Sequence, residues 1–120
     1  MQPDFRFRIH RIGACFPDKY NVDIFVLPDG TVEGTVRSTV DTIGFIPVSF
    51  TIDRTCVYEM KGAFEGLDAS DCDEPSINIG YGEAGAPLDI KSLHPLLLMN
   101  DPGASFLWHK CVEICDMCLP

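Results

Sequence analysis

Residues 22–40 read VDIFVLPDGTVEGTVRSTV, two alternating segments joined by a tight turn. In the turn Pro28 fixes φ, the Asp29 side chain can bond the local backbone, and Gly30 accepts a positive φ. Before the turn apolar residues occupy both faces of the segment, and after it apolar and polar residues alternate with a period of two. These features predict a β-hairpin whose first strand lies inside a sheet and whose second strand has one exposed face.

Further alternation predicts strands on both sides of this hairpin. Residues 5–10 alternate Phe and Ile with Arg and His, which is typical of a half-buried strand. Residues 43–52 predict another strand, and Pro47 places its start at a sheet edge or a bend. We expect two shorter segments, residues 56–60 and 76–81, to add strands to the same sheet.

The C-terminal segment is compatible with a strand or with a short helix. As a strand it has one apolar face formed by Phe106, Trp108, Val112 and Ile114. As a helix it has a continuous stripe formed by Leu107, Cys111, Ile114, Cys115 and Cys118. We favour the strand, because Ser105 is the only capping signal that precedes the segment.

About seven short strands separated by turns predict an all-β fold, a small antiparallel β-sandwich or barrel. The length of 120 residues is that of one domain, which we assign to residues 1–120. The net charge of −9 and the pI of about 4.5 oppose binding to a phosphate backbone, so we expect no nucleic-acid partner. The longest apolar run, residues 96–99, is too short for a transmembrane segment.

The charges are unevenly distributed along the chain. Arg6, Arg8 and Arg11 lie close to His10 near the start, and acidic residues gather in residues 65–74. One interpretation is that these clusters compensate each other or form two solvated faces. The alternative is that the basic strand docks an acidic partner.

The chain contains six cysteines, and we expect them to be oxidised in pairs. They are Cys15, Cys56, Cys72, Cys111, Cys115 and Cys118. Six cysteines allow fifteen pairings, so the sequence does not select one. Our working arrangement couples Cys56 with Cys72, joins Cys15 to one tail cysteine and bridges the other two tail cysteines locally. Because disulfides are rare in the cytosol, this framework predicts a secreted, extracellular protein.

A metal site is the intracellular alternative to this framework. The ligands would be His109, Cys111, Cys115 and Cys118, which are the residue types that bind zinc. The protein would then be a zinc-stabilised interaction module that uses its C-terminal tail. In the favoured interpretation we expect neither a metal nor a cofactor.

The sequence contains no recognisable catalytic motif, so we nominate no catalytic residue. We expect a non-enzymatic protein, and a small hydrolase without a nominated triad is a further alternative. Apolar residues near the end of the chain are the candidate ligand-binding residues: Leu96, Leu97, Leu98, Met99, Phe106 and Trp108. The leading hypothesis is a secreted, non-enzymatic binding domain. Its partner would be a protein or a small apolar ligand held between sheets.

Cys15 lies early in the chain and Cys111 lies in the last predicted strand. This placement, together with the number of predicted strands, resembles small secreted lipid-recognition sandwiches of the MD-2-related type. The resemblance implies that Cys15 is tied to Cys111 and that a lipid sits between two sheets. The short early cysteine loop of that family is missing from this chain.

Overall fold

A computed structural model of the protein describes residues 5–11, 20–38, 44–66, 77–83, 85–93 and 102–118. The described elements are, in chain order, β1 (Phe5–Arg11), β2 (Tyr20–Val26), β3 (Thr31–Ser38), β4 (Phe45–Thr51), α1 (Arg54–Glu65), β5 (Ile77–Glu83), β6 (Asp89–Leu93) and α2 (Pro102–Cys118). All strand pairs are antiparallel, and the strand order is β4-β3-β2-β1-β5-β6.

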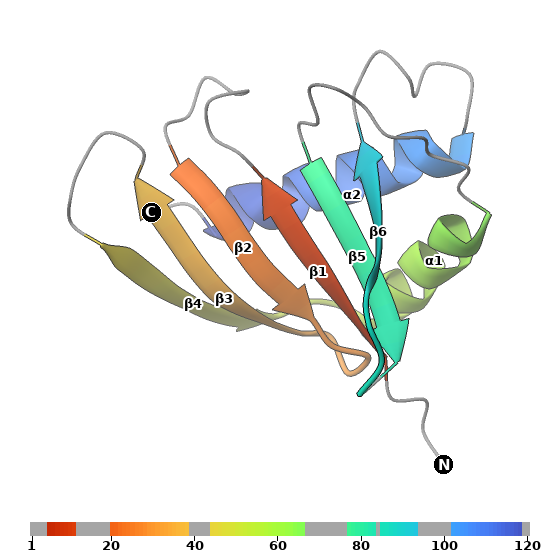
Figure 1. Cartoon of the computed structure of the whole chain (residues 1–120), viewed down its shortest axis with the longest axis horizontal. Coiled ribbons are helices and arrows are strands. Elements are labelled where there is room, and N and C mark those ends of the chain that lie inside the picture. Colours follow the sequence, from red (N-terminus) through yellow and green to blue (C-terminus); the bar gives the residue numbers. More distant parts are fainter. Residues whose placement is uncertain are drawn as a thin grey trace.

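Both helices lie on one side of this sheet, as Figure 1 shows. In that view α2 crosses behind the central strands, and α1 lies beside the β6 edge of the sheet. The core forms between the two layers, because every second residue of each central strand points toward the helices. Its largest fully buried side chains are Phe7, Ile9, Val22, Ile24, Val26, Val32, Val36, Met60, Ile77, Ile79, Leu93 and Leu107.

The central hairpin has the predicted form. The Leu27 N–H donates to the Thr31 carbonyl oxygen at 2.8 Å, and Asp29 accepts from the Thr31 N–H at 2.9 Å. Gly30 has a φ of 96°, and a Cβ atom there would collide with the carbonyl oxygen of Ile52. The turn therefore needs glycine for its backbone angle and for its close contact with the chain entering α1.

The predicted positions of the strands within the sheet are confirmed. β2 pairs with β1 on one side and with β3 on the other, so it lies inside the sheet as its two apolar faces indicate. β4, which contains Pro47, is an edge strand. Val48, Phe50 and Ile52 of this segment pack against the core.

The prediction of a strand at residues 56–60 is wrong, because this segment belongs to α1. The Asp53 side chain accepts a hydrogen bond from the Thr55 N–H at 2.9 Å and so caps the first turn of the helix. Val57, Met60 and Phe64 then follow at helical spacing and are the buried residues of α1. The segment is helical because a helix places all three of these apolar side chains on the face that packs against the sheet.

The C-terminal strand that we favoured is also wrong, and the helical alternative is confirmed. α2 buries the stripe that a helix requires: Ala104, Leu107, Cys111, Ile114, Cys115 and Cys118. Pro102 occupies the first helical position, where its missing N–H costs no hydrogen bond. At the other end, buried Arg11 donates to the Asp116 carboxylate at 3.0 Å, which ties α2 to the end of β1.

The antiparallel, mostly β character of the fold is confirmed, but the sandwich or barrel is not. The described residues contain six strands in one sheet, and the layer that faces this sheet is helical. A second sheet was expected because both helical segments also show alternation over a few residues. The apolar run at residues 96–99 lies outside the described residues.

Candidate functional site

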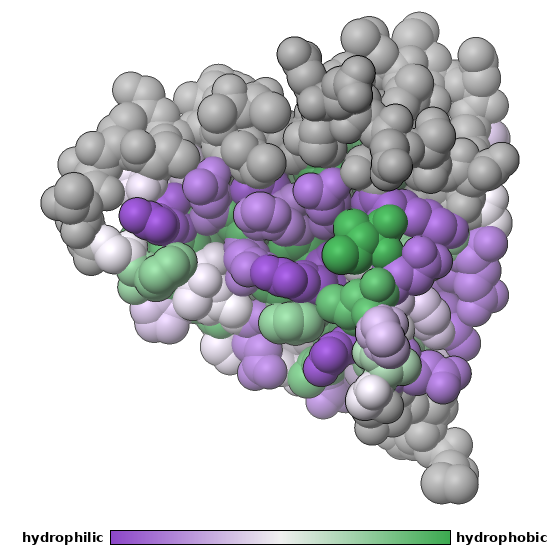
Figure 2. Space-filling view, in the orientation of Figure 1, coloured by the Kyte–Doolittle hydropathy of each residue, from purple (hydrophilic) through white to green (hydrophobic). Residues whose placement is uncertain are grey.

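One side of the sheet carries no described helix, and we call it the open face. Strand alternation defines its side chains: Arg6, Arg8 and His10 on β1; Asn21, Asp23 and Phe25 on β2; Glu33, Thr35 and Arg37 on β3; Phe45, Pro47, Ser49 and Thr51 on β4; Asn78, Gly80 and Gly82 on β5; and Ile90 on β6. Figure 2 looks onto this face and shows apolar residues over β5 and β6 beside polar residues over β1 and β2.

An ion pair lies at the centre of the open face. Arg8 donates from Nε and Nη2 to the two carboxylate oxygens of Asp23, at 2.9 and 2.8 Å. These hydrogen bonds hold the pKa of Asp23 below its ordinary value and raise the pKa of Arg8, although burial opposes both shifts. The bidentate geometry fixes the Arg8 guanidinium beside His10.

Arg6 is held in a different way from Arg8. Its guanidinium carbon lies 5.4 Å from the centre of the Phe25 ring, and that of Arg8 lies 6.0 Å from the same ring. Among the described residues, the buried Nε of Arg6 has no hydrogen-bond partner, and Arg6 forms no ion pair. The positive charge of Arg6 is therefore not neutralised within the described part of the chain.

A small hollow adjoins these side chains on the open face, and we call it the Gly80 pocket. It has a volume of about 120 Å³ and is lined by Arg8, His10, Asn78, Gly80 and Ile90. Antiparallel pairing sets Gly80 opposite Arg8 and Gly82 opposite Arg6. Because glycine has no side chain, this part of β5 leaves space between the arginines and the apolar side chain of Ile90.

The charge balance of the open face differs from that of the rest of the chain. Its side chains include three arginines, Arg6, Arg8 and Arg37, and two carboxylates, Asp23 and Glu33, whereas the whole chain has a net charge of −9. By contrast, α2 carries Lys110 against Glu113 and Asp116. The open face is thus a locally basic surface on an acidic molecule.

A second, wider hollow of about 520 Å³ lies between the hairpin turn and the start of α1. It is lined by Pro28, Asp29, Arg54, Thr55 and Tyr58. The Asp29 carboxylate is already engaged, since it accepts from the backbone of Thr31. This hollow therefore offers one exposed arginine and one tyrosine ring, a less complete set of polar groups than the open face.

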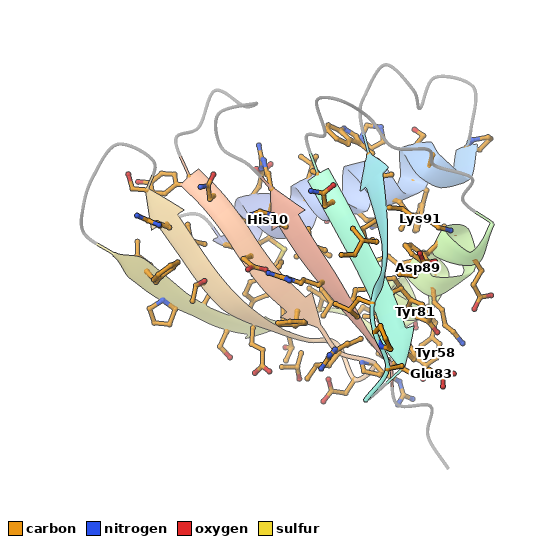
Figure 3. All side chains as sticks on the ribbon, in the orientation of Figure 1. His10, Tyr58, Tyr81, Glu83, Asp89 and Lys91 are labelled. Carbon is orange, nitrogen blue, oxygen red and sulfur yellow. The ribbon has the colours of Figure 1, made fainter. Side chains whose placement is uncertain are left out.

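Another polar cluster lies at the β5–β6 edge, apart from His10, as Figure 3 shows. There the Lys91 Nζ donates to the Phe64 carbonyl oxygen at 3.1 Å and lies 4.3 Å from the centre of the Phe64 ring. Tyr81 packs against Phe64 with 5.4 Å between ring centres. These contacts fasten α1 to the edge of the sheet and give the cluster a structural role.

The structure describes two of the six candidate ligand-binding residues. Phe106 and Trp108 lie half-buried on α2 and pack against the core, and neither lines one of the two hollows described above. The other four, Leu96 to Met99, lie outside the described residues. An apolar ligand was expected between two sheets, but the described strands form a single sheet, and side chains of α1 and α2 cover its inner face.

The four candidate zinc ligands do not converge in the described helix. His109 is exposed, whereas Cys111, Cys115 and Cys118 are buried on the face that packs on the sheet. Within the described residues, no three His, Cys, Asp or Glu side chains are placed to hold a metal ion.

The expected disulfides are not observed among the described cysteines, because Cys56, Cys111, Cys115 and Cys118 are thiols. A local bridge in the tail conflicts with the helix: residues three or four apart have Cβ atoms about 5–6 Å apart, beyond the roughly 4 Å of a disulfide. The proposed partner Cys72, and Cys15, lie outside the described residues.

Burial sets the chemistry of these thiols. It raises the pKa of Cys118 to about 11 and, together with the neighbouring Cys115 and Cys56, raises the pKa of Cys111 well above its ordinary value. Burial also raises the pKa of the half-buried Cys56. The thiols therefore stay protonated near neutral pH and are weak nucleophiles.

Comparison with known proteins adds no family to this description. No protein-family model matches the sequence, and a search of curated proteins returns no match. Among the described residues, neither helix combines the length and the apolar character needed to cross a membrane.

Proposed function

We propose that this protein is a non-enzymatic binding module whose open face binds an acidic segment of a protein partner. The observation that carries the proposal is the row of Arg6, Arg8 and His10 on a sheet face without a described helix. Arg6 supplies a charge with no described counter-ion. The Gly80 pocket is lined by the other two residues of the row, Arg8 and His10. Charge complementarity therefore selects a partner that carries carboxylates.

A protein segment is favoured over a small apolar ligand. The interior surface of the sheet is filled by α1 and α2, which leaves the open face as the accessible surface of the central strands. That face mixes guanidinium groups with the Phe25 ring and the exposed Ile90 side chain. Arginine and aromatic side chains are enriched where proteins recognise other proteins.

A short acidic peptide is also favoured over nucleic acid. With a net charge of −9, the molecule repels an extended polyphosphate at long range. A peptide segment with a few carboxylates is repelled far less. Within the Debye length of about 8 Å at physiological salt, it interacts mainly with the arginines of the open face. The extracellular location stays a prediction, which the disulfide framework motivated.

Peptide titration of the isotope-labelled protein tests the proposal. The probe is a short capped peptide with alternating glutamates, compared with the same peptide carrying glutamine and with one carrying lysine. We expect the glutamate peptide to bind best, to shift the backbone amide signals of β1, β2 and β5, and to leave those of α2 unchanged. Added salt should weaken the binding.

Charge-matched variants locate the binding surface. Arg6→Gln should weaken binding of the glutamate peptide about two- to fivefold, as expected for loss of one partly exposed charge. Arg54→Gln causes the same change in net charge at the start of α1 and should leave the affinity unchanged. Equal effects of the two variants, or equal binding of all three peptides, would contradict the proposal.

A further inference from the structure

We infer that the Gly80 pocket is a recognition site for one glutamate side chain of the partner. The inference rests on the proposed function, and it adds which residue of the partner the open face selects. Its basis is the combination of guanidinium, imidazole and amide groups on one side of the pocket with an aliphatic side chain on the other. These two kinds of lining require a ligand with both a carboxylate and an apolar stem.

Arg8 keeps donors for such a carboxylate. A guanidinium group has five N–H donors, and Asp23 uses one from Nε and one from Nη2. The N–H groups of Nη1 are not used by Asp23, so Arg8 can bind a second carboxylate while it stays oriented by the first. His10 follows Arg8 on the same face of β1. Its partner Asn78 precedes Gly80 on β5, and both residues extend the polar wall.

The other wall of the pocket favours the longer acidic side chain. Ile90 is 59% exposed although it is a large aliphatic residue, so covering it contributes to binding. A hollow of about 120 Å³ has room for one side chain. Glutamate covers Ile90 with two methylene groups, whereas aspartate has one.

Gly80 provides a position at which an added Cβ atom has room beside the apolar wall of the pocket. A Cβ atom at Gly80 would lie 3.4 Å from Leu88 side-chain atoms and 3.5 Å from Ile90 Cγ1, which are ordinary contacts. The corresponding atom at Gly82 would lie 3.0 Å from the Pro87 carbonyl oxygen, so Gly82 is unsuitable. In addition, alanine or valine at a strand position restricts the unfolded chain more than glycine does.

The experiment measures the affinity of capped peptides that differ at a single position. This position carries glutamate, glutamine or aspartate, and a fourth peptide carries its only carboxylate at a free C-terminus. For the unchanged protein we expect about tenfold tighter binding of glutamate than of glutamine, the size of a charge-assisted hydrogen bond. Aspartate and the free C-terminus should bind more weakly than glutamate.

Gly80→Val should abolish the preference for glutamate, and Gly80→Ala should reduce it. Ser49→Thr adds one carbon to the same face on β4 and is the matched control, for which the preference should persist. Thermal unfolding of each variant shows whether it is folded, and Gly80→Ala is used if the valine variant is not.

The outcomes separate the inference from the proposed function. If Gly80→Val and Gly80→Ala bind all peptides like the unchanged protein, the glutamate pocket is wrong while the acidic-segment proposal stands. Preference for the free C-terminus would likewise overturn the assignment to a side chain. If the unchanged protein does not distinguish glutamate from glutamine in any peptide, both are overturned.

Discussion

Asp23 has two opposing effects on the ability of Arg8 to bind an acidic partner. It orients Arg8 through two hydrogen bonds, and it neutralises a charge that would otherwise attract an acidic partner. The two side chains are 43% and 40% exposed, so water screens their attraction. An ion pair of this kind contributes at most about 1 kcal/mol to stability.

Asp23→Asn should therefore separate stability from binding. We expect the free energy of unfolding at pH 7 to fall by about 0.5–1 kcal/mol, since the ion pair is lost. Binding of the glutamate peptide should become tighter, because Arg8 no longer has a counter-charge. Urea unfolding and peptide titration measure the two effects, and weaker binding by a folded Asp23→Asn variant would contradict this account of the site.

The same variant has a predictable pH dependence. The folded-state pKa of Asp23 is lowered, so the ion pair stabilises the fold fully above the unfolded pKa of about 3.9. This contribution is lost as the pH falls through the lower folded-state pKa. The stability difference between the unchanged protein and Asp23→Asn should thus shrink on acidification, and a constant difference would exclude Asp23 as its source.

At the scale of elements, the sequence predicted the structures that depend on local signals. The hairpin around Gly30 requires turn residues that are adjacent in the chain, and the alternation of β1 is complete within seven residues. The helices were missed because a few residues of alternating apolar and polar character occur in helices as well as in strands. Only the longer stripe of α1, from Val57 to Phe64, distinguishes a helix, and Gly62 interrupts its helical pattern.

The candidate site was predictable only in part for a similar reason. Arg6, Arg8 and His10 follow from alternation, because they share one face of a single strand. Gly80 and Ile90 join them through the pairing of β1 with β5 and of β5 with β6. No local pattern reports these pairings between distant segments. The alternating glycines of β5 were a usable signal, since glycine in a strand indicates close approach of a neighbour or ligand.

The helix α1 can be tested by two opposed substitutions, one at its N-cap and one near its C-terminal end. Asp53→Ala removes the helix cap and should lower the free energy of unfolding by about 1 kcal/mol. Gly62→Ala should raise it by about 0.5–1 kcal/mol, because Gly62 is an exposed helical residue with open space around its missing Cβ. The double variant should unfold near the urea midpoint of the unchanged protein. An unchanged midpoint for Asp53→Ala would place the start of the helix elsewhere.

At the scale of the whole molecule, the two faces of the sheet have different roles. One face is sealed by α1 and α2, whose apolar stripes provide the core without a disulfide among the described cysteines. The other face carries the arginines and the Gly80 pocket. The cysteine-rich C-terminal segment predicted disulfides, but its described cysteines are buried in the helical layer. They act there as small apolar residues, which is common for free thiols.

Thiol labelling tests this view of the cysteines across the whole molecule. In native protein at pH 8, the half-buried Cys56 should be alkylated first of the four described cysteines, and Cys111, Cys115 and Cys118 should be protected until the chain unfolds in urea. Labelling of Cys118 should increase as the pH approaches its pKa of about 11, since the thiolate is the reactive form. Peptide mapping by mass spectrometry assigns each label to its residue.

A disulfide between any two of these four cysteines, in protein isolated without reductant, would contradict the structure of the helical layer. It would also restore the oxidised, extracellular framework that the cysteine count suggests.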